Sequence, residues 1–209
     1  MQKHVDIADF VEVTPTADIS TATHGGRAKC LQRLVRLELP LPKTVALSFS
    51  GVRKIAAGQP VATDEVLDLI GDRLVSVRPS SEVADWGGPG AVLNIGMNAA
   101  RHAALSNTIG HAAADALYRR FIQSFAVQVA HLEPELFEDA DASVAELRAA
   151  YEEETDEPFP DDPSRQLLDV LRAMARAWEG TSARLLRQAR GAPSDASLGL
   201  VVQAMALGV

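Results

Sequence analysis

Two stretches of the chain hold the residue types that best suit the binding of a phosphate group. The first is GGRAK (25–29), in which two glycines precede two bases at the expected start of a helix. Free backbone N–H groups at a helix start and the side chains of Arg27 and Lys29 could together hold an anion. The alternative for this stretch is an ordinary helix entry with two solvated bases.

The second stretch is an arginine at the expected end of a strand. Arg78 closes the β-rich run RLVSVR (73–78), and a glycine-rich segment, GGPG (87–90), follows it. A guanidinium at the end of a buried strand, facing such a loop, suits a forked contact with phosphate oxygens. The alternative is an ion pair between Arg78 and a loop carboxylate such as Glu82 or Asp85. Neither stretch is specific by itself.

Other common catalytic patterns are absent from the sequence. It contains no HExxH, Walker A, GxSxG, GxGxxG or CxxC motif. Its single cysteine, Cys30, cannot form an internal disulfide. Cys30 falls on the apolar side of the expected helix, so we predict an inert, packed thiol.

The elements that must position these residues change in character near residue 100. Before it, strands at 44–49 and 73–78 alternate with helices at 51–57 and 64–70, as in α/β units. We expect Ser50 and Thr63 to cap these two helices. After it, the pattern is helical to about residue 190, with a capping box at Ser143 and a helix opening at Asp162-Pro163, and an apolar run (199–207) follows.

We therefore expect an α+β protein, with an α/β nucleotide-binding lobe at 1–100 that 191–209 completes. A helical subdomain at 101–190 carries an acidic window, since Glu133 to Asp162 contain thirteen acids and one base, Arg148. The net charge of the 209 residues is −8, and outside the window it is positive. We expect no nucleic-acid partner, because neutralisation of the phosphates would have to overcome the acidic window. No apolar run is long enough to span a membrane, so we expect a cytoplasmic protein.

Several collinear stretches give the chain a family resemblance. It resembles the N-terminal nucleotide-binding region of pyruvate phosphate dikinase and phosphoenolpyruvate synthase from about residue 24 onward. The stretches that carry the resemblance are GGRAKCLQRLVRLELPLP (25–42), LVSVRPSS (74–81), VLNIGMN (92–98), YRRFIQSF (118–125), EPFPDDPSRQL (157–167), AMARAW (173–178) and VVQAM (201–205).

The resemblance implies a partial ATP-grasp fold that binds ATP with Mg²⁺. It places Arg78 as a phosphate-binding arginine and Arg27 at the position of the lysine in the family's GGKG motif. Gly87 matches a glycine of the loop over the phosphates, while Gln203 and Met205 match the segment bordering the adenine. The implied metal ligands lie in a further lobe, so none is expected within this chain.

This sequence also departs from the family's pattern. GGKGAN is here GGRAKC (25–30), and in DWGGPGA (85–91) the loop's Asp-Thr pair is replaced by Gly90-Ala91. We expect an incomplete ATP-binding region of a phosphotransferase, a kinase-type enzyme that is inactive alone and needs a missing lobe or a partner chain. The alternative is a diverged, non-catalytic regulatory or protein-binding module, in effect a pseudoenzyme. A homodimer through the uncovered face is also expected.

Overall fold

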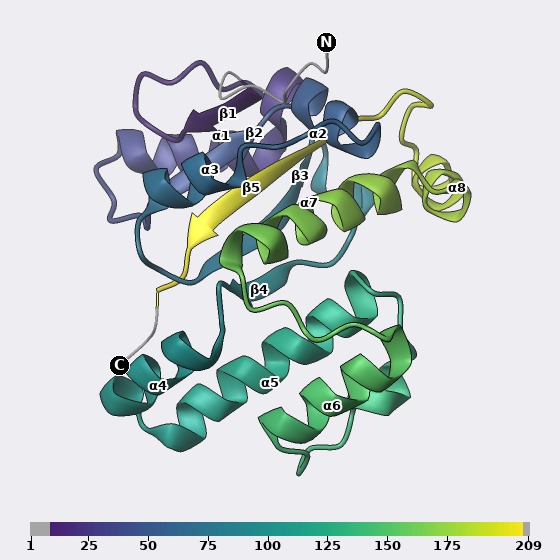
Figure 1. The fold of residues 1–209 in the computed structure, drawn as a ribbon. Helices are drawn as coiled ribbons and strands as arrows, with labels where there is room; N and C mark the ends of the chain where they lie inside the picture. The colour runs from purple at the N-terminus through teal and green to yellow at the C-terminus, as the bar shows by residue number, and fades with distance from the viewer. Residues whose placement is uncertain (1–8, 207–209) are drawn as a thin grey trace.

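The computed structural model describes residues 9–206 and shows strands and helices alternating along the chain, with a helix-only stretch between β4 and β5 (Figure 1). The elements are β1 (Phe10–Glu12), α1 (Thr21–Arg36), β2 (Thr44–Leu47), α2 (Phe49–Ala56), α3 (Thr63–Ile70), β3 (Val75–Ser81), η2 (Ala84–Trp86), β4 (Val92–Ile95), α4 (Ala99–Ile109), α5 (His111–Gln128), η3 (Pro134–Phe137), α6 (Val144–Thr155), α7 (Pro163–Glu179), α8 (Thr181–Ala189) and β5 (Leu198–Ala204).

Within residues 9–206, the fold is organised by a five-stranded sheet with the strand order β1-β2-β5-β3-β4. Every neighbouring pair of strands is antiparallel. The α+β class is thus confirmed, although the strand and helix alternation, which is typical of parallel α/β units, here accompanies an antiparallel sheet. The last strand, β5, lies in the middle of the sheet between β2 and β3. Residue 207, at the end of the expected strand, lies outside the described residues.

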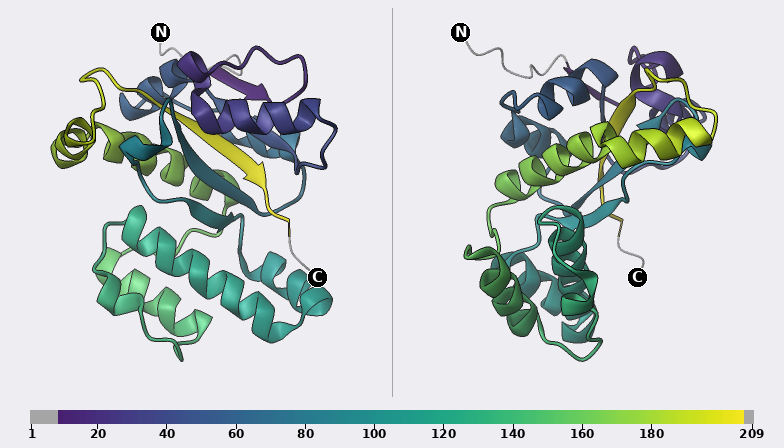
Figure 2. Two further views of the ribbon diagram at one scale, coloured as in Figure 1. Left: turned by 180° about the vertical axis from the view of Figure 1, so that it is seen from behind. Right: turned by 90° about the vertical axis from the view of Figure 1, so that its right-hand side faces the viewer.

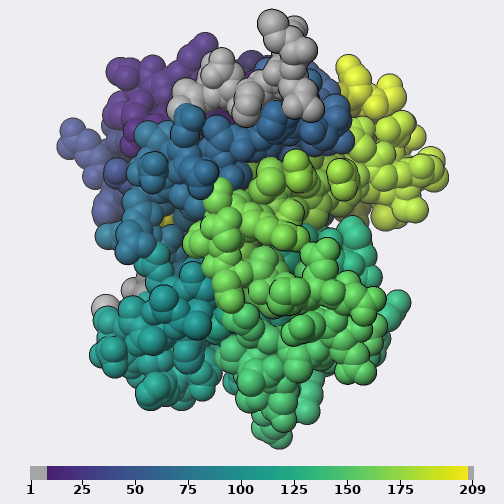
Figure 3. Space-filling model, in the orientation of Figure 1, coloured from purple at the N-terminus to yellow at the C-terminus, as the bar shows by residue number. Residues whose placement is uncertain are grey.

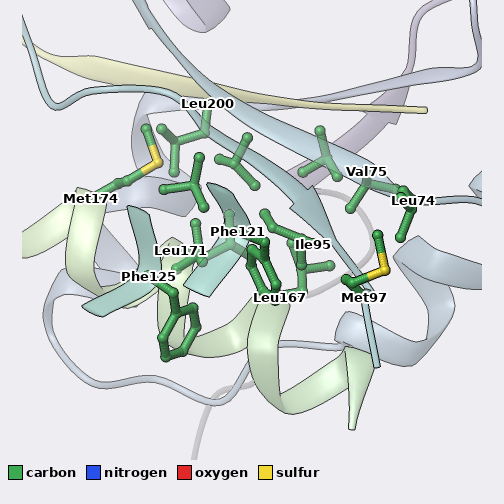
Figure 4. Packing of buried hydrophobic residues seen from close by; sticks show 14 of the residues in the cluster. Leu74, Val75, Ile95, Met97, Phe121, Phe125, Leu167, Leu171, Met174 and Leu200 are labelled. Carbon is green, nitrogen blue, oxygen red and sulfur yellow. The ribbon is translucent and has the colours of Figure 1, made fainter. Parts of the chain in front are cut away.

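The two faces of the sheet are covered by different helices (Figures 1 and 2). Helix α1 packs on one face, where Ala28 meets Ala46 and Val201 in a small apolar cluster. Helices α2, α3 and α7 lie on the other side, and the main core fills the space between α7, the sheet and α5 (Figure 4). Core residues labelled there, such as Leu171, Phe121 and Leu200, are fully buried.

The helices between β4 and β5 divide into two groups. Helices α4, α5 and α6 lie together below the sheet, whereas α7 contacts α2 and α3, and α8 contacts α7 (Figures 1 and 3). One continuous cluster of buried side chains includes both sheet and helical residues. The predicted division into a lobe and a helical subdomain at residue 100 stays a prediction. Through this core, α7 packs against both the sheet and α5.

Several local predictions can be compared with the structure. The capping box from Ser143 to Glu146 and the helix opening at Asp162-Pro163 are confirmed. The predicted caps of α2 and α3 are wrong, because the N-cap residues are Ser48 and Ala62. In α2 the Ser48 hydroxyl accepts the Gly51 N–H at 3.1 Å, so the helix starts two residues earlier than expected.

None of the described helices is both long and apolar enough to cross a membrane.

Candidate functional site

A hollow of about 500 Å³ lies between α1, the end of β3 and the glycine-rich segment that follows η2. None of its lining residues is an aspartate or a glutamate. Glu82 and Asp85 are chain neighbours of lining residues but are not part of the lining, so the charged side chain in the wall of the hollow is Arg27. The lining residues are Gly26, Arg27, Cys30, Leu31, Pro79, Ser80, Ser81, Ala84, Gly87, Gly88 and Pro89.

A kink at Gly25 brings α1 against the end of β3. Gly25 has φ +83° and ψ 170° and interrupts the helix that begins at Thr21, so the expected loop before the helix is a kink within it. The Ser80 hydroxyl fixes this approach, because it donates to the His24 carbonyl at 2.7 Å and accepts the Ala28 N–H at 3.1 Å. A Cβ atom at Gly25 would collide with the Ser80 carbonyl.

Ser80 was missed by the sequence reasoning, although its place two residues after Arg78 on the same strand was a usable signal. The neighbouring residue His24 is 8% exposed, and Thr23 Oγ1 lies 2.8 Å from its Nδ1. Burial lowers the pKa of His24, and the negative charge of Asp18 partly opposes this effect.

The two bases of the first stretch have different surroundings. Arg27 is exposed at the hollow, and its Nε donates to the Pro79 carbonyl at 2.9 Å. Its two terminal amino groups have no hydrogen-bond or ion-pair partner among residues 9–206. Lys29 does not line the hollow, because its Nζ donates to the Ile19 carbonyl at 2.7 Å and to Gln32 Oε1 at 2.8 Å.

The cysteine prediction is wrong, because Cys30 is exposed and lines the hollow. Helix α1 packs on the sheet through the face that carries Ala28. Cys30 is two positions further on, a rotation of about 200° around the helix axis, so it faces away from that contact. The thiol is therefore available as a reporter of what enters the hollow.

Arg78 lies inside β3 and not at its end. The strand runs on through Pro79 to Ser81, because its backbone stays paired with β5 as far as Leu198. Arg78 is opposite Val201 in the register, and its side chain is therefore on the α1 side of the sheet. It is half-buried, and neither Glu82 nor Asp85 forms the alternative ion pair. In the described part of the chain, its guanidinium has no ion-pair partner.

Gln203 and Met205 lie at the other end of β5. Gln203 is 8% exposed, and its Nε2 donates to the Thr44 hydroxyl at 2.9 Å. Met205 follows the strand, is partly buried, and donates its backbone N–H to the Leu74 carbonyl at 2.7 Å. Of the six predicted ATP-binding residues, two line the hollow, Arg27 and Gly87. The other four do not line it: Lys29, Arg78, Gln203 and Met205.

The arrangement suits binding of a phosphorylated ligand better than binding of a bare metal ion. Residues 9–206 hold no group of three or more His, Cys, Asp or Glu side chains placed to share a metal. The prediction that Mg²⁺ is held elsewhere stays a prediction. What the hollow offers is a guanidinium, a glycine-rich backbone and an exposed thiol.

Comparison with known proteins gives one consistent family. No family model matches the chain. It is similar to the pyruvate, phosphate dikinase of Rhizobium meliloti (strain 1021), 32% identical over 161 residues that cover 65% of this chain and 18% of the relative. The same enzyme of Clostridium symbiosum is 25% identical over 227 aligned positions, covering 88% and 26%. Pyruvate, phosphate dikinase 2 of Zea mays is 30% identical over 156 residues, covering 65% and 18%. The chain spans about a fifth to a quarter of these relatives.

Proposed function

We propose that this chain, a region related to the pyruvate phosphate dikinases, binds the phosphates of ATP. The proposed site is the hollow between α1 and the glycine-rich segment. The single observation that carries the proposal is the acid-free lining of this hollow, with Arg27 presenting two unpaired amino groups to it. Such a site favours polyanions over neutral or cationic ligands.

Each predicted residue has a role in this proposal. Arg27 contacts phosphate oxygens in the hollow, and the backbone around Gly87 closes over them. Arg78 does not line the hollow, and its proposed contact is made from the α1 side of the sheet, where its side chain lies. Gln203 and Met205 border the adenine. Lys29 holds Gln32 and the segment before α1, so its part is to fix the kinked helix that carries Arg27.

The wider context of the site is also part of the proposal. The chain forms part of an ATP-grasp fold, is a component of a phosphotransferase, and does not turn ATP over alone. Phosphoryl transfer depends on positioning and on charge neutralisation by metal and bases. Mg²⁺ would arrive with ATP and supply charge neutralisation. The replacement of the family's Asp-Thr pair by Gly90-Ala91 supports the absence of turnover.

The single cysteine allows a direct test of nucleotide binding. Cys30 is exposed in the hollow, so bound ATP should slow its alkylation by iodoacetamide in a saturable manner. Adenosine at the same concentration should protect much less, because it lacks the phosphates that the arginines contact. Protection is compared with and without ligand within each variant, so that changes in intrinsic thiol reactivity cancel.

Substitution of the arginines then tests whether Arg27 and Arg78 contribute to ATP binding. Loss of a charged hydrogen bond costs about 1.5–3 kcal/mol, so Arg78→Ala and Arg27→Ala should each weaken ATP binding by roughly 10-fold to 150-fold in calorimetry. The matched control is Arg33→Ala, an exposed arginine of α1 that does not line the hollow. Absence of both heat and thiol protection at millimolar ATP would show that the proposal is wrong.

A further inference from the structure

The junction between α7 and α8, called the corner here, packs against the glycine-rich segment that lines the hollow. Trp178, at the end of α7, is 1% exposed, and its Nε1 donates to the Ala196 carbonyl at 3.0 Å. The Arg187 guanidinium stacks on the Trp178 ring at 3.6 Å from its centroid and donates to the Trp178 carbonyl at 2.7 Å. Arg187 is only 6% exposed, so it serves to fix α8 on α7.

The segment 87–88 lies directly on this corner. A Cβ atom at Gly88 would be 3.6 Å from Cζ3 of Trp178, which is ordinary packing contact. At Gly87, where φ is +82°, a Cβ atom would collide with the guanidinium of Arg190. Arg190 directly follows the last residue of α8, so the corner fixes its position. Its guanidinium lies against the backbone of Gly87, which lines the hollow.

The charge of Arg190 is not neutralised locally. Within residues 9–206 no carboxylate lies within ion-pair distance of it, and the nearby acid of the corner, Glu179, is paired with Arg184 at 3.3 Å. The hollow beyond Gly87 has no acidic lining residue either. Arg190 is exposed and does not itself line the hollow, but its guanidinium lies against Gly87, which does. It therefore adds positive charge beside the rim, while Arg27 provides it from α1.

We propose that Arg190 is a further anion-binding residue of the hollow, which contacts the outer phosphates of a polyphosphate ligand at the Gly87 rim. This inference rests on the proposed function. It gives the site a third guanidinium, after those of Arg27 and Arg78, and this one comes from the residue that follows α8. Position 87 favours glycine because its φ of +82° is one that side chains rarely adopt, and a Cβ atom there would also push the Arg190 guanidinium away from Gly87.

The test measures binding of inorganic tripolyphosphate, ATP and AMP to the whole chain by calorimetry and by protection of Cys30. Arg190→Gln should weaken tripolyphosphate and ATP by about fivefold to twentyfold and AMP much less, because only the outer phosphates reach the rim. Arg190→Lys should recover part of the loss. The matched control is Arg184→Gln, an exposed arginine of α8 that pairs with Glu179, and it should leave all three affinities unchanged.

The outcomes separate this inference from the proposed function. If the unchanged chain binds tripolyphosphate and Arg190→Gln binds it equally well, the inference is wrong and the proposed function stands. If the unchanged chain binds none of the three ligands, both are wrong. A purely structural role for Arg190 would weaken all three ligands alike and shift the fluorescence of Trp178 and Trp86 in the free protein, and this result would also overturn the inference.

Discussion

Replacement of Gln166 by alanine should be one of the most damaging single changes in the chain. The Gln166 side chain is completely buried in α7. Its Oε1 accepts the Gly96 N–H at 2.7 Å, and its Nε2 donates to the carbonyls of Met97 at 2.9 Å and Pro160 at 2.7 Å. One side chain thus joins the turn after β4 to the segment that enters α7.

The expected loss follows from these three bonds. The first two are fully buried, and a buried backbone group left without a partner costs about 1–3 kcal/mol, while the third, partly exposed bond contributes about 0.5–1.5 kcal/mol. Gln166→Ala should therefore lower the free energy of unfolding by about 2.5–7.5 kcal/mol, a large part of the roughly 5–15 kcal/mol typical of a domain.

Urea denaturation followed by far-UV circular dichroism measures this change. The matched control is Gln188→Ala, an exposed glutamine of α8, which should change the free energy of unfolding by no more than about 0.5 kcal/mol. A loss below about 1.5 kcal/mol for Gln166→Ala, with an unchanged denaturant slope, would refute the reasoning, because it would mean that the three backbone groups find other partners.

Two further predictions concern backbone conformation and pH. Gly25→Ala should lower the free energy of unfolding by about 2–4 kcal/mol, because the Cβ atom meets the Ser80 carbonyl at a φ that side chains rarely adopt. Gly58→Ala, also at positive φ but with open space around it, should cost only about 1–2 kcal/mol, and equal losses in urea denaturation would contradict the packing argument. Hydrogen bonds from the Ser143 backbone and hydroxyl lower the pKa of Glu146 in the folded protein. The ionised carboxylate therefore stabilises the fold at pH values above its unfolded-state pKa. This contribution is lost as the pH falls through the folded-state pKa. Glu146→Gln should accordingly lower the melting temperature at neutral pH and have no effect in strong acid, whereas an effect of the same size at both pH values would point to a different cause.

The parts of the structure that were predicted correctly are those that local sequence controls. The capping box at Ser143 and the Pro163 helix start need only a few neighbouring residues, so their sequence pattern is sufficient. Strand positions in β2 and β3 followed from short runs of β-branched and apolar residues. The resemblance to the dikinases, which the comparisons confirm at the level of family, likewise depends on short collinear motifs.

Tertiary structure alone decided how these elements meet. The central place of β5 and the antiparallel pairing depend on contacts between residues far apart in the chain. Pairing with β5 extends β3 beyond Arg78 to Ser81. The exposure of Cys30 follows from how α1 lies on the sheet, which the pattern of one helix could not specify. The contact between Arg190 and Gly87 joins two loops that no local pattern connects, and it exists because Trp178 and Arg187 fix the corner between α7 and α8.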